Sequence, residues 1–194
     1  MLKVRAWLNC IMGKENSEKI ILGIDPGTNI MGYGIIAVRA NKMNLIDLGS
    51  IKIKKQTGHE LKLKEIFECC MELIVKYLPD EMAIESPFYG KNIQAMLKLG
   101  RAQGVAMAAA MSREIPIVEY APRKIKQSVT GNGNASKAQV ASMLYSIFNI
   151  KSSPTEDATD ALAIAVCHHF QKGINKQPRA SWDSFVKNNP ERLR

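Results

Sequence analysis

One segment near the N-terminus constrains the fold more than any other part of the chain. Residues 21–36 read as a short apolar strand that ends at Asp25, a Pro-Gly turn, and a second strand that contains Gly32 and Gly34. So short a turn lets the second strand run back beside the first. A buried strand that delivers one carboxylate to a tight turn holds that charge rigidly where another molecule can meet it. Asp25 is therefore the first candidate functional residue.

The next part of the chain predicts a third strand and a helix. The later half of residues 44–53 alternates between apolar and polar side chains, as a half-buried strand does, and this completes an antiparallel meander. Apolar residues then recur at helical spacing over residues 63–78, and Pro79 ends this helix. The length of 194 residues fits one domain with a substantial core.

Strands and helices alternate over the rest of the chain. We expect a strand over residues 81–85, a helix over 92–113, a strand over 115–120, a short helix over 122–129, a helix opened by the capping box of Ser136 and Gln139, and a last helix that follows residues 153–155 and runs to Phe170. A meander followed by this alternation predicts an α/β fold, a five-stranded mixed β-sheet flanked by helices on both faces. This order of elements is that of the ribonuclease H-like architecture.

Two terminal segments and one internal loop lack these patterns. Residues 1–19 carry mixed charge without periodicity and are expected to form a flexible N-terminal extension. Residues 171–194 are polar and net positive, and we expect a disordered tail. Residues 130–134 place two glycines among polar residues and predict a flexible loop. The folded domain is thus expected over residues 20–170.

The charge balance indicates a polyanionic partner. The chain has 27 Lys and Arg residues against 18 Asp and Glu, for a net charge of +9. A basic surface of this kind is typical of proteins that bind nucleic acid, although charge alone does not require that role. The four cysteines form no metal-ligand or disulfide pattern, and no signal peptide or membrane span is apparent. We therefore expect a soluble, cytoplasmic protein without membrane partners.

Three more acidic residues accompany Asp25. Glu85 ends the strand over residues 81–85, and Asp157 and Asp160 lie on one face of the first turns of the last helix. Each alone has an ordinary explanation, because Asp forms turns and negative charge is favoured at a helix N-terminus. Together they suggest an oxygen-only site for two Mg²⁺ ions, with Mn²⁺ as a substitute and Asp25 bridging both ions. The histidines (His59, His168 and His169) show no ligand spacing.

Four segments in this order resemble the RuvC family of bacterial Holliday-junction resolvases. They are residues 23–28 (GIDPGT), 83–88 (AIESPF), 97–104 (LKLGRAQG) and 157–163 (DATDALA). The resemblance extends over about residues 20–170, which would therefore form the nuclease domain. Some relatives have His at the position of Asp157, whereas this chain has four carboxylates.

The resemblance implies a crossover junction endodeoxyribonuclease that acts in DNA recombination and repair. It would be a homodimer that nicks two like strands of a four-way junction symmetrically and leaves 5′-phosphate and 3′-hydroxyl ends. The four carboxylates, Asp25, Glu85, Asp157 and Asp160, would be the catalytic Mg²⁺ ligands. Cooperation with the branch-migration proteins RuvA and RuvB is implied by the family as well.

Several further residues are candidates for DNA contacts. Phe88 lies three residues after Glu85 on an expected loop, where it would either stack on an unpaired base or pack on the core. The resemblance favours stacking, with Tyr89 as its neighbour. It also places Lys126 and Lys137, which flank the glycine-rich loop, near the cleaved phosphate. The remaining candidates for contacts with the DNA backbone are Arg123, Lys124, Lys91 and Lys98.

Small residues recur every four positions on the helix over residues 92–113. Gly100, Gly104 and Ala108 form one row, and such a row lets another surface approach closely. That surface is either the sheet of the same chain or a second copy of the helix. The family resemblance predicts a dimer here, since symmetric cleavage of two strands requires two sites.

Three other functions remain open from the residues alone. An actin-like ATPase or sugar kinase also begins with a strand, an Asp and a Gly-Thr turn, but it needs a second phosphate-binding turn that does not occur here. A nuclease for RNA–DNA hybrids would use the same four carboxylates. A DNA-binding module without catalytic activity would be hindered by an acidic cluster close to the DNA.

Overall fold

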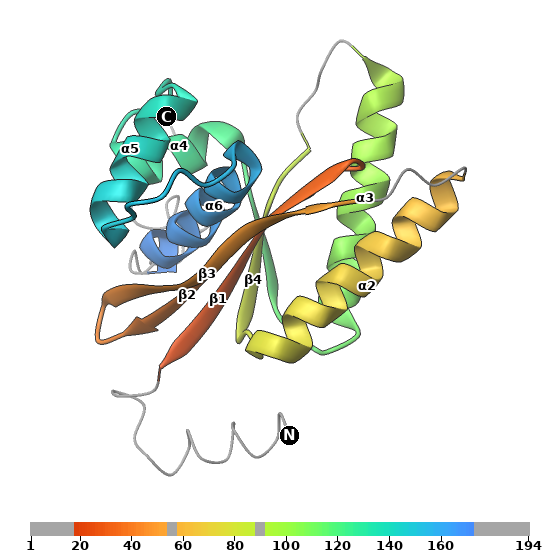
Figure 1. Ribbon diagram of the computed structural model, residues 1–194, viewed down its shortest axis with the longest axis horizontal. Helices are drawn as coiled ribbons and strands as arrows, with labels where there is room; N and C mark the ends of the chain where they lie inside the picture. The colour runs from red at the N-terminus through yellow and green to blue at the C-terminus, as the bar shows by residue number, and fades with distance from the viewer. Residues whose placement is uncertain (1–17, 54–57, 88–91, 173–194) are drawn as a thin grey trace, which may run out of the picture.

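The computed structural model describes residues 18–53, 58–87 and 92–172, which form one sheet with helices on both faces (Figure 1). The strands lie in the order β3-β2-β1-β4-β5. β1 pairs with β2 and β2 with β3 in antiparallel ladders, whereas β1 with β4 and β4 with β5 are parallel. The bounds are β1 (Lys19–Asp25), β2 (Ile30–Arg39), β3 (Lys42–Lys52), β4 (Glu81–Glu85) and β5 (Ile117–Tyr120). The predicted five-stranded mixed sheet is confirmed.

Five helices of the described chain cover the two faces of the sheet. α2 and α3 pack on one face, and α4, α5 and α6 lie together over the other (Figure 1). The bounds are α2 (His59–Tyr77), α3 (Ile93–Met111), α4 (Pro122–Thr130), α5 (Lys137–Phe148) and α6 (Glu156–Lys172). None of these helices has both the length and the apolar character needed to cross a bilayer.

The differences from the sequence-based expectations lie at element ends. α2 begins at His59, four residues before the predicted start, because its first turn is polar and carries no apolar period. The capping box of Ser136 and Gln139 is confirmed at the start of α5. The loop expected to be flexible is closed by local hydrogen bonds: the N–H of Asn132 donates to Thr130 Oγ1 (3.2 Å), and the N–H of Asn134 donates to Asn132 Oδ1 (3.0 Å).

Each face of the sheet has its own hydrophobic core. Leu22 and Ile24 of β1 point into the core shared with α2 and α3, whereas Ile21 points into the core under α4, α5 and α6. This alternation follows from the two-residue period of a strand. α6 is the most deeply buried helix, with every residue over 161–168 buried. A helix this apolar on all sides belongs in the interior of a domain.

α6 lies unusually close to β1 and β2 because three strand positions have no side chain. A Cβ atom at Gly23 would lie 2.2 Å from the carbonyl oxygen of Ala161, and one at Gly32 would lie 2.0 Å from that of Asp157. Gly34, the ladder partner of Gly23, would meet the Cα atom of Leu162 at 2.6 Å. Real Cβ atoms do not approach backbone atoms this closely, so only glycine permits this packing.

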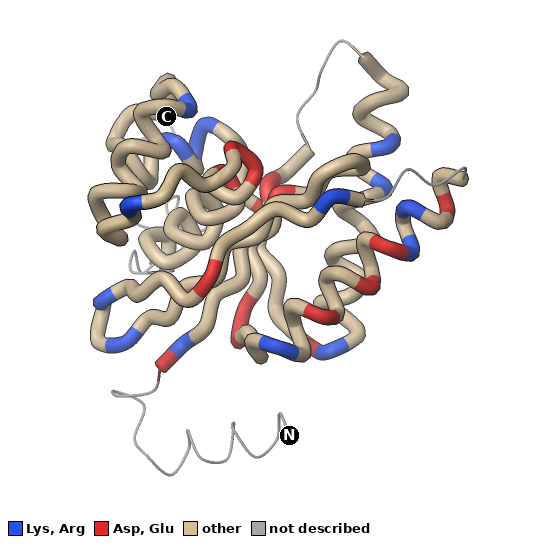
Figure 2. The backbone as a smooth tube through the Cα atoms, in the orientation of Figure 1, with Lys and Arg blue, Asp and Glu red and all other residues tan. Residues whose placement is uncertain are grey.

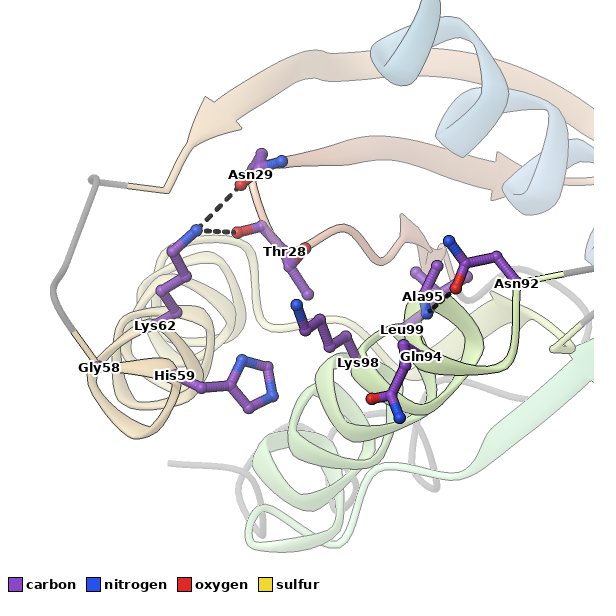
Figure 3. A pocket seen from close by; sticks show the side chains of 10 residues that line it. All are labelled: Thr28, Asn29, Gly58, His59, Lys62, Asn92, Gln94, Ala95, Lys98 and Leu99. Carbon is purple, nitrogen blue, oxygen red and sulfur yellow. Dashed lines mark hydrogen bonds between the residues drawn. The ribbon is translucent and has the colours of Figure 1, made fainter.

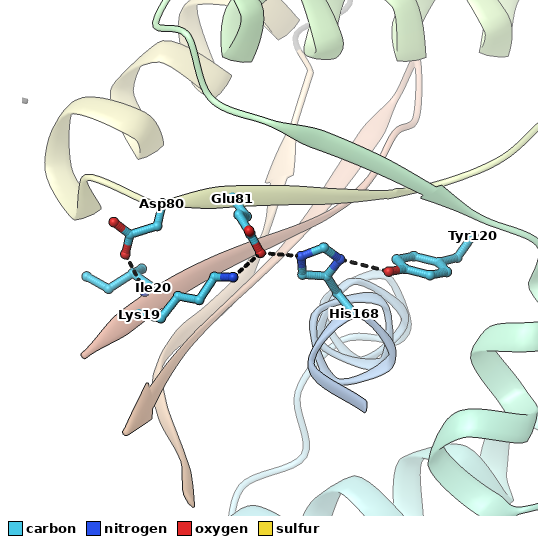
Figure 4. A network of polar contacts seen from close by, with 6 residues as sticks. All are labelled: Lys19, Ile20, Asp80, Glu81, Tyr120 and His168. Atoms are coloured by element: carbon cyan, nitrogen blue, oxygen red, sulfur yellow. Dashed lines mark hydrogen bonds and ion pairs between the residues drawn. The ribbon is translucent and has the colours of Figure 1, made fainter. Parts of the chain in front are cut away.

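A buried polar network fixes the other half of α6 to the sheet (Figure 4). His168 is fully buried, and its Nε2 lies 2.6 Å from Oε2 of Glu81 while its Nδ1 lies 2.8 Å from the hydroxyl of Tyr120. Lys19 pairs with the same Glu81 oxygen at 2.5 Å. Burial and then the charge of Lys19 lower the pKa of His168 to about 4, so a neutral ring links the two partners.

We predict that Gly34→Ala destabilises the fold by about 1–3 kcal/mol or more, because the added methyl overpacks the contact with α6. Asn44→Ala is the control, since this side chain is exposed on β3. That control should change the free energy of unfolding by no more than about 0.5 kcal/mol. Urea unfolding measures both changes, and equal effects of the two substitutions would contradict the close approach of α6.

Candidate active site

Two of the four predicted carboxylates stand at the ends of neighbouring parallel strands. Asp25 is the last residue of β1, and Glu85 is the last residue of β4. The ladder of the two strands runs in register up to the pair of Ile24 and Ile84, one residue before each carboxylate. Parallel strands bring their carboxyl ends to the same edge of a sheet, so both acidic side chains emerge there together.

The start of α6 adds the other two carboxylates. Asp157 and Asp160 occupy the first turns of this helix, as predicted, and Glu156 precedes them. The backbone of Asp157 packs directly on Gly32, which is the ladder partner of Asp25. In Figure 2 acidic positions from the sheet and from the start of α6 gather near the centre of the molecule. Close packing of α6 thus brings residues far apart in the sequence to one edge.

A cavity of about 340 Å³ lies at this edge. Three of the predicted carboxylates line it, together with two lysines and an apolar wall. The charged lining residues are Asp25, Glu85, Asp160, Lys126 and Lys137, and the apolar ones are Pro122, Ile125, Val140, Ala163 and Ile164. Asp157 does not line the cavity, but its charge acts on Asp25. The structure therefore brings together five of the predicted site residues in one cavity.

Mutual repulsion and burial perturb the acidic groups. Burial, and then the charges of Glu85, Asp160 and Asp157, raise the pKa of Asp25 to about 7, whereas Lys137 opposes this shift. The pKa of Glu85 is also raised, first by burial and then by Asp160, with Lys137 and Lys126 acting in the other direction. Such a site favours a bound cation, because a positive charge stabilises the ionised carboxylates.

Lys137 supplies part of that positive charge. Its Nζ lies 2.7 Å from Oδ2 of Asp160 and 2.7 Å from Oε1 of Glu156. Burial alone would lower the pKa of this ammonium group, but the two carboxylates outweigh burial and raise it. Glu156 was not among the predicted site residues. Its spacing of four from Asp160 puts both on one helix face, which is the signal that could have identified it.

Comparison with known proteins gives this arrangement a family. Residues 21–168 match the family described as crossover junction endodeoxyribonuclease RuvC. A relative with that name from Cytophaga hutchinsonii is 58% identical, over 91% of this chain and 89% of its own length. One from Bacteroides fragilis is 54% identical, over 91% and 97% of the two chains. The chain belongs to the RuvC family.

Solved structures agree with this assignment. The structure described as T. thermophilus RuvC in complex with Holliday junction substrate matches with a TM-score of 0.74 and 31% identity, over 79% of this chain and 94% of that one. The yeast mitochondrial Holliday junction resolvase Ydc2 shares the fold, with a TM-score of 0.60 and 13% identity. The predicted ribonuclease H-like architecture is thereby confirmed for this RuvC-family chain.

The donor set of the RuvC-family site fits a hard divalent cation. The four predicted ligands offer only carboxylate oxygens, which Mg²⁺ and Mn²⁺ prefer. Among the described residues, no three acidic, His or Cys side chains converge closely enough to enclose one ion. Ion binding would therefore draw Asp25, Glu85 and Asp160 together from the walls of their shared cavity, and it would compete with Lys137 for Asp160.

The other predicted DNA-binding residues lie elsewhere or outside the described ranges. Phe88, Tyr89 and Lys91 fall outside the residues that the structure describes. Arg123 and Lys124 are exposed on α4 but do not line the acidic cavity, and Lys98 on α3 lines a different one. His59 lines that other cavity, and neither His168 nor His169 is among the residues that line the acidic one.

We predict that Asp25→Asn stabilises the metal-free protein at pH 8. The pKa of Asp25 is about 7 in the folded state, whereas the ordinary pKa of an Asp side chain is 3.8. Between these two pH values the folded state binds more protons than the unfolded state. Stability therefore falls as pH rises through this window, by about 2–4 kcal/mol. Urea unfolding in EDTA should show that the free energy of unfolding of the wild type falls from pH 4 to pH 8, and that the variant does not show this fall. A difference between the two proteins that does not change with pH would contradict the raised pKa.

Proposed function

We propose that this RuvC-family chain resolves Holliday junctions by metal-dependent nicking of two like strands during recombination and DNA repair. The observation that carries the proposal is the cavity in which Asp25, Glu85 and Asp160 face Lys126 and Lys137. The acidic groups suit divalent cations, and the basic groups suit a phosphate. The proposed nuclease domain covers residues 20–170. Family membership over residues 21–168 supports the same activity.

The four carboxylates are the proposed ligands of two Mg²⁺ ions, with Mn²⁺ as a substitute. When bound, the ions supply the charge that activates a water molecule and stabilises the leaving 3′-oxygen, so that the products carry 5′-phosphates. Asp25 sits on the most rigid element of the site, the end of a buried central strand, and it is the proposed bridge between the ions. Its pKa of about 7 means that cation binding releases a proton near neutral pH.

The two lysines orient the phosphate to be cut. Lys126 comes from α4 and Lys137 from the start of α5, on either side of the glycine-containing loop. The ion pairs of Lys137 with Asp160 and Glu156 hold its ammonium group at the mouth of the acidic cavity. A phosphate oxygen there would meet a donor that is already in position. Phe88, Arg123 and Lys91 remain proposed DNA contacts around this centre.

A homodimer is the proposed working form, because the described part of one chain carries one acidic cavity of this kind and symmetric cleavage needs two. The exposed face of α3 supports it. Ile93, Leu97 and Met111 are 69%, 52% and 66% exposed along this helix, and a methyl at Gly100 or Gly104 would meet no atom within 4 Å. The small residues therefore do not pack on the sheet of their own chain. They leave room for a second copy of the helix.

Two further assignments follow from the proposed activity. RuvA and RuvB, the branch-migration proteins that the family resemblance implies, are proposed partners at the junction. The cytoplasm is the proposed location, because the relatives are bacterial and their chromosomal DNA lies there.

We predict that Asp25→Asn lowers the rate of junction nicking by at least about 100-fold. Even mutation of a residue that only hydrogen-bonds to a metal ligand lowers metal affinity or activity by about 10–100-fold. Binding of the junction should persist, because the substitution removes a negative charge from a site that faces a polyanion. Glu72→Gln, which makes the same change on the exposed surface of α2, is the control and should nick normally.

The substrates for this assay are a four-way junction, a linear duplex and an RNA–DNA hybrid, each with Mg²⁺. Paired nicking of the junction alone supports the proposal. Preferred cleavage of the hybrid would replace junction resolution with another ribonuclease H-like activity, and turnover of ATP would indicate the kinase-like class. Nicking by Asp25→Asn at the wild-type rate would remove this residue from the mechanism.

We also predict that Ala108→Asp converts the dimer to a monomer. Ala108 lies on the same exposed row of α3 as Gly100 and Gly104, and two carboxylates brought face to face across a symmetric contact repel each other. Asn44→Asp on the exposed part of β3 is the control. Light scattering measures the mass of each variant, and a wild-type protein that stays monomeric at all concentrations would rule out the homodimer.

A further inference from the structure

A second cavity, of about 600 Å³, lies on the other side of the sheet edge from the acidic one, between the N-terminal ends of α2 and α3 (Figure 3). Its walls come from the turn after β1 and from both helices. The lining residues are Thr28, Asn29, Gly58, His59, Lys62, Asn92, Gln94, Ala95, Lys98 and Leu99. No acidic residue is among them within the described part of the chain. Glu60 lies against Gly58 but does not line the cavity.

Two ammonium groups reach into this cavity from opposite helices. Lys62 of α2 donates to the carbonyl oxygen of Thr28 (3.4 Å) and to Oδ1 of Asn29 (3.0 Å), which leaves one of its three N–H groups for another acceptor. Lys98 extends from α3 toward Thr28 (Figure 3). No hydrogen bond or ion pair joins Lys98 to any residue over 18–53, 58–87 and 92–172. The described lining of the cavity thus carries two positive charges and no carboxylate.

The start of α2 forms part of the same cavity wall. The residue before α2 is Gly58, so no side chain hydrogen-bonds to the first backbone N–H groups of the helix, and Glu60 is the acidic residue of its first turn. Nε2 of His59 is buried and has no hydrogen-bond partner within the described ranges. The ring of His59 and the side chain of Lys98 face the same space (Figure 3). The two ammonium groups and the backbone N–H groups at the start of α2 match a phosphate in chemistry.

The chain itself ties this cavity to the acidic one. Thr28 follows Asp25 by three residues, which spans at most about 11 Å between their Cα atoms. Asp25 lines one cavity and Thr28 lines the other. A DNA strand carries a phosphate at every nucleotide, so a strand with one phosphate at the carboxylates brings others of the same strand within reach of the second cavity.

We infer that the cavity between α2 and α3 binds a backbone phosphate of the junction, at a position of the cut strand other than the one that is cleaved. This inference rests on the proposed function. Lys62 and Lys98 are the positioning residues. They hold the strand in register over the carboxylates without reading its bases, as phosphate contacts do. The hydrogen bonds of Lys62 to Thr28 and Asn29 connect this phosphate contact to the turn that follows Asp25.

The test measures binding of a fluorescent four-way junction over a series of salt concentrations. The variants are Lys62→Gln, Lys98→Gln and the double variant, and unfolding curves check that each is folded. Affinity should fall several-fold for each, and the slope of log affinity against log salt should become shallower by about 1 for each lysine removed. Lys98→Gln is the decisive single variant, because Lys98 has no bond to the turn that its loss could disturb.

Lys42→Gln is the matched control and should bind like the wild type. Lys42 is exposed at the start of β3, and its ladder partner Arg39 lies about 24 Å along β2 from Gly32, the ladder partner of Asp25. Junctions with one neutral methylphosphonate at successive positions beside the cut locate the contact. One such position should weaken binding by the wild type but have no further effect on the double variant.

Two outcomes separate this inference from the function on which it rests. If Lys98→Gln and the double variant bind the junction with the affinity and salt slope of the wild type, and the wild type nicks normally, the phosphate site is overturned. The proposed nuclease function is then unaffected. Failure of the wild type to bind or nick the junction would overturn the proposed function, and this inference with it.

Discussion

The close approach of α6 to the sheet is the constraint on which the whole site depends. Gly23, Gly32 and Gly34 leave room for the backbone of a helix where any side chain would collide with it. Gly32 pairs with Asp25 across the ladder, so the space that it leaves is filled by the backbone of Asp157. Packing at these glycines therefore determines how closely acidic groups from the first strand and the last helix can lie. A looser contact would produce the same fold with a dispersed site.

The electrostatics of the site follow from that packing. Burial at a sheet edge and three nearby acidic groups raise the pKa of Asp25 to about 7, and Lys137 relieves only part of the repulsion. Folding thus assembles a group of charges that is unfavourable by itself and becomes favourable when cations and a phosphate are added. The acidic groups at this edge lower the stability of the folded state, as is common at functional sites. The buried apolar contacts of α6 supply the compensating free energy.

Much of this arrangement could be predicted from local sequence signals. A strand that ends in a carboxylate before a turn indicates Asp25, and the same pattern indicates Glu85, while the spacing of Asp157 and Asp160 indicates one helix face. Spacing could have placed Glu156 on the helix face of Asp160, but no local pattern shows that Lys137 of a different helix pairs with both. The same holds for the buried contact of His168 with Glu81, which joins residues 87 positions apart.

The order of the elements along the chain has a consequence for synthesis. β1, with Asp25, is made early, but α6 is the last helix of the described chain and carries Asp157 and Asp160. A nascent polypeptide on the ribosome holds only two of the four proposed acidic ligands until that helix has emerged and docked. If the four carboxylates form the catalytic centre as proposed, a translation product that stops before Glu156 would lack half of that centre and could not cut DNA before α6 has docked.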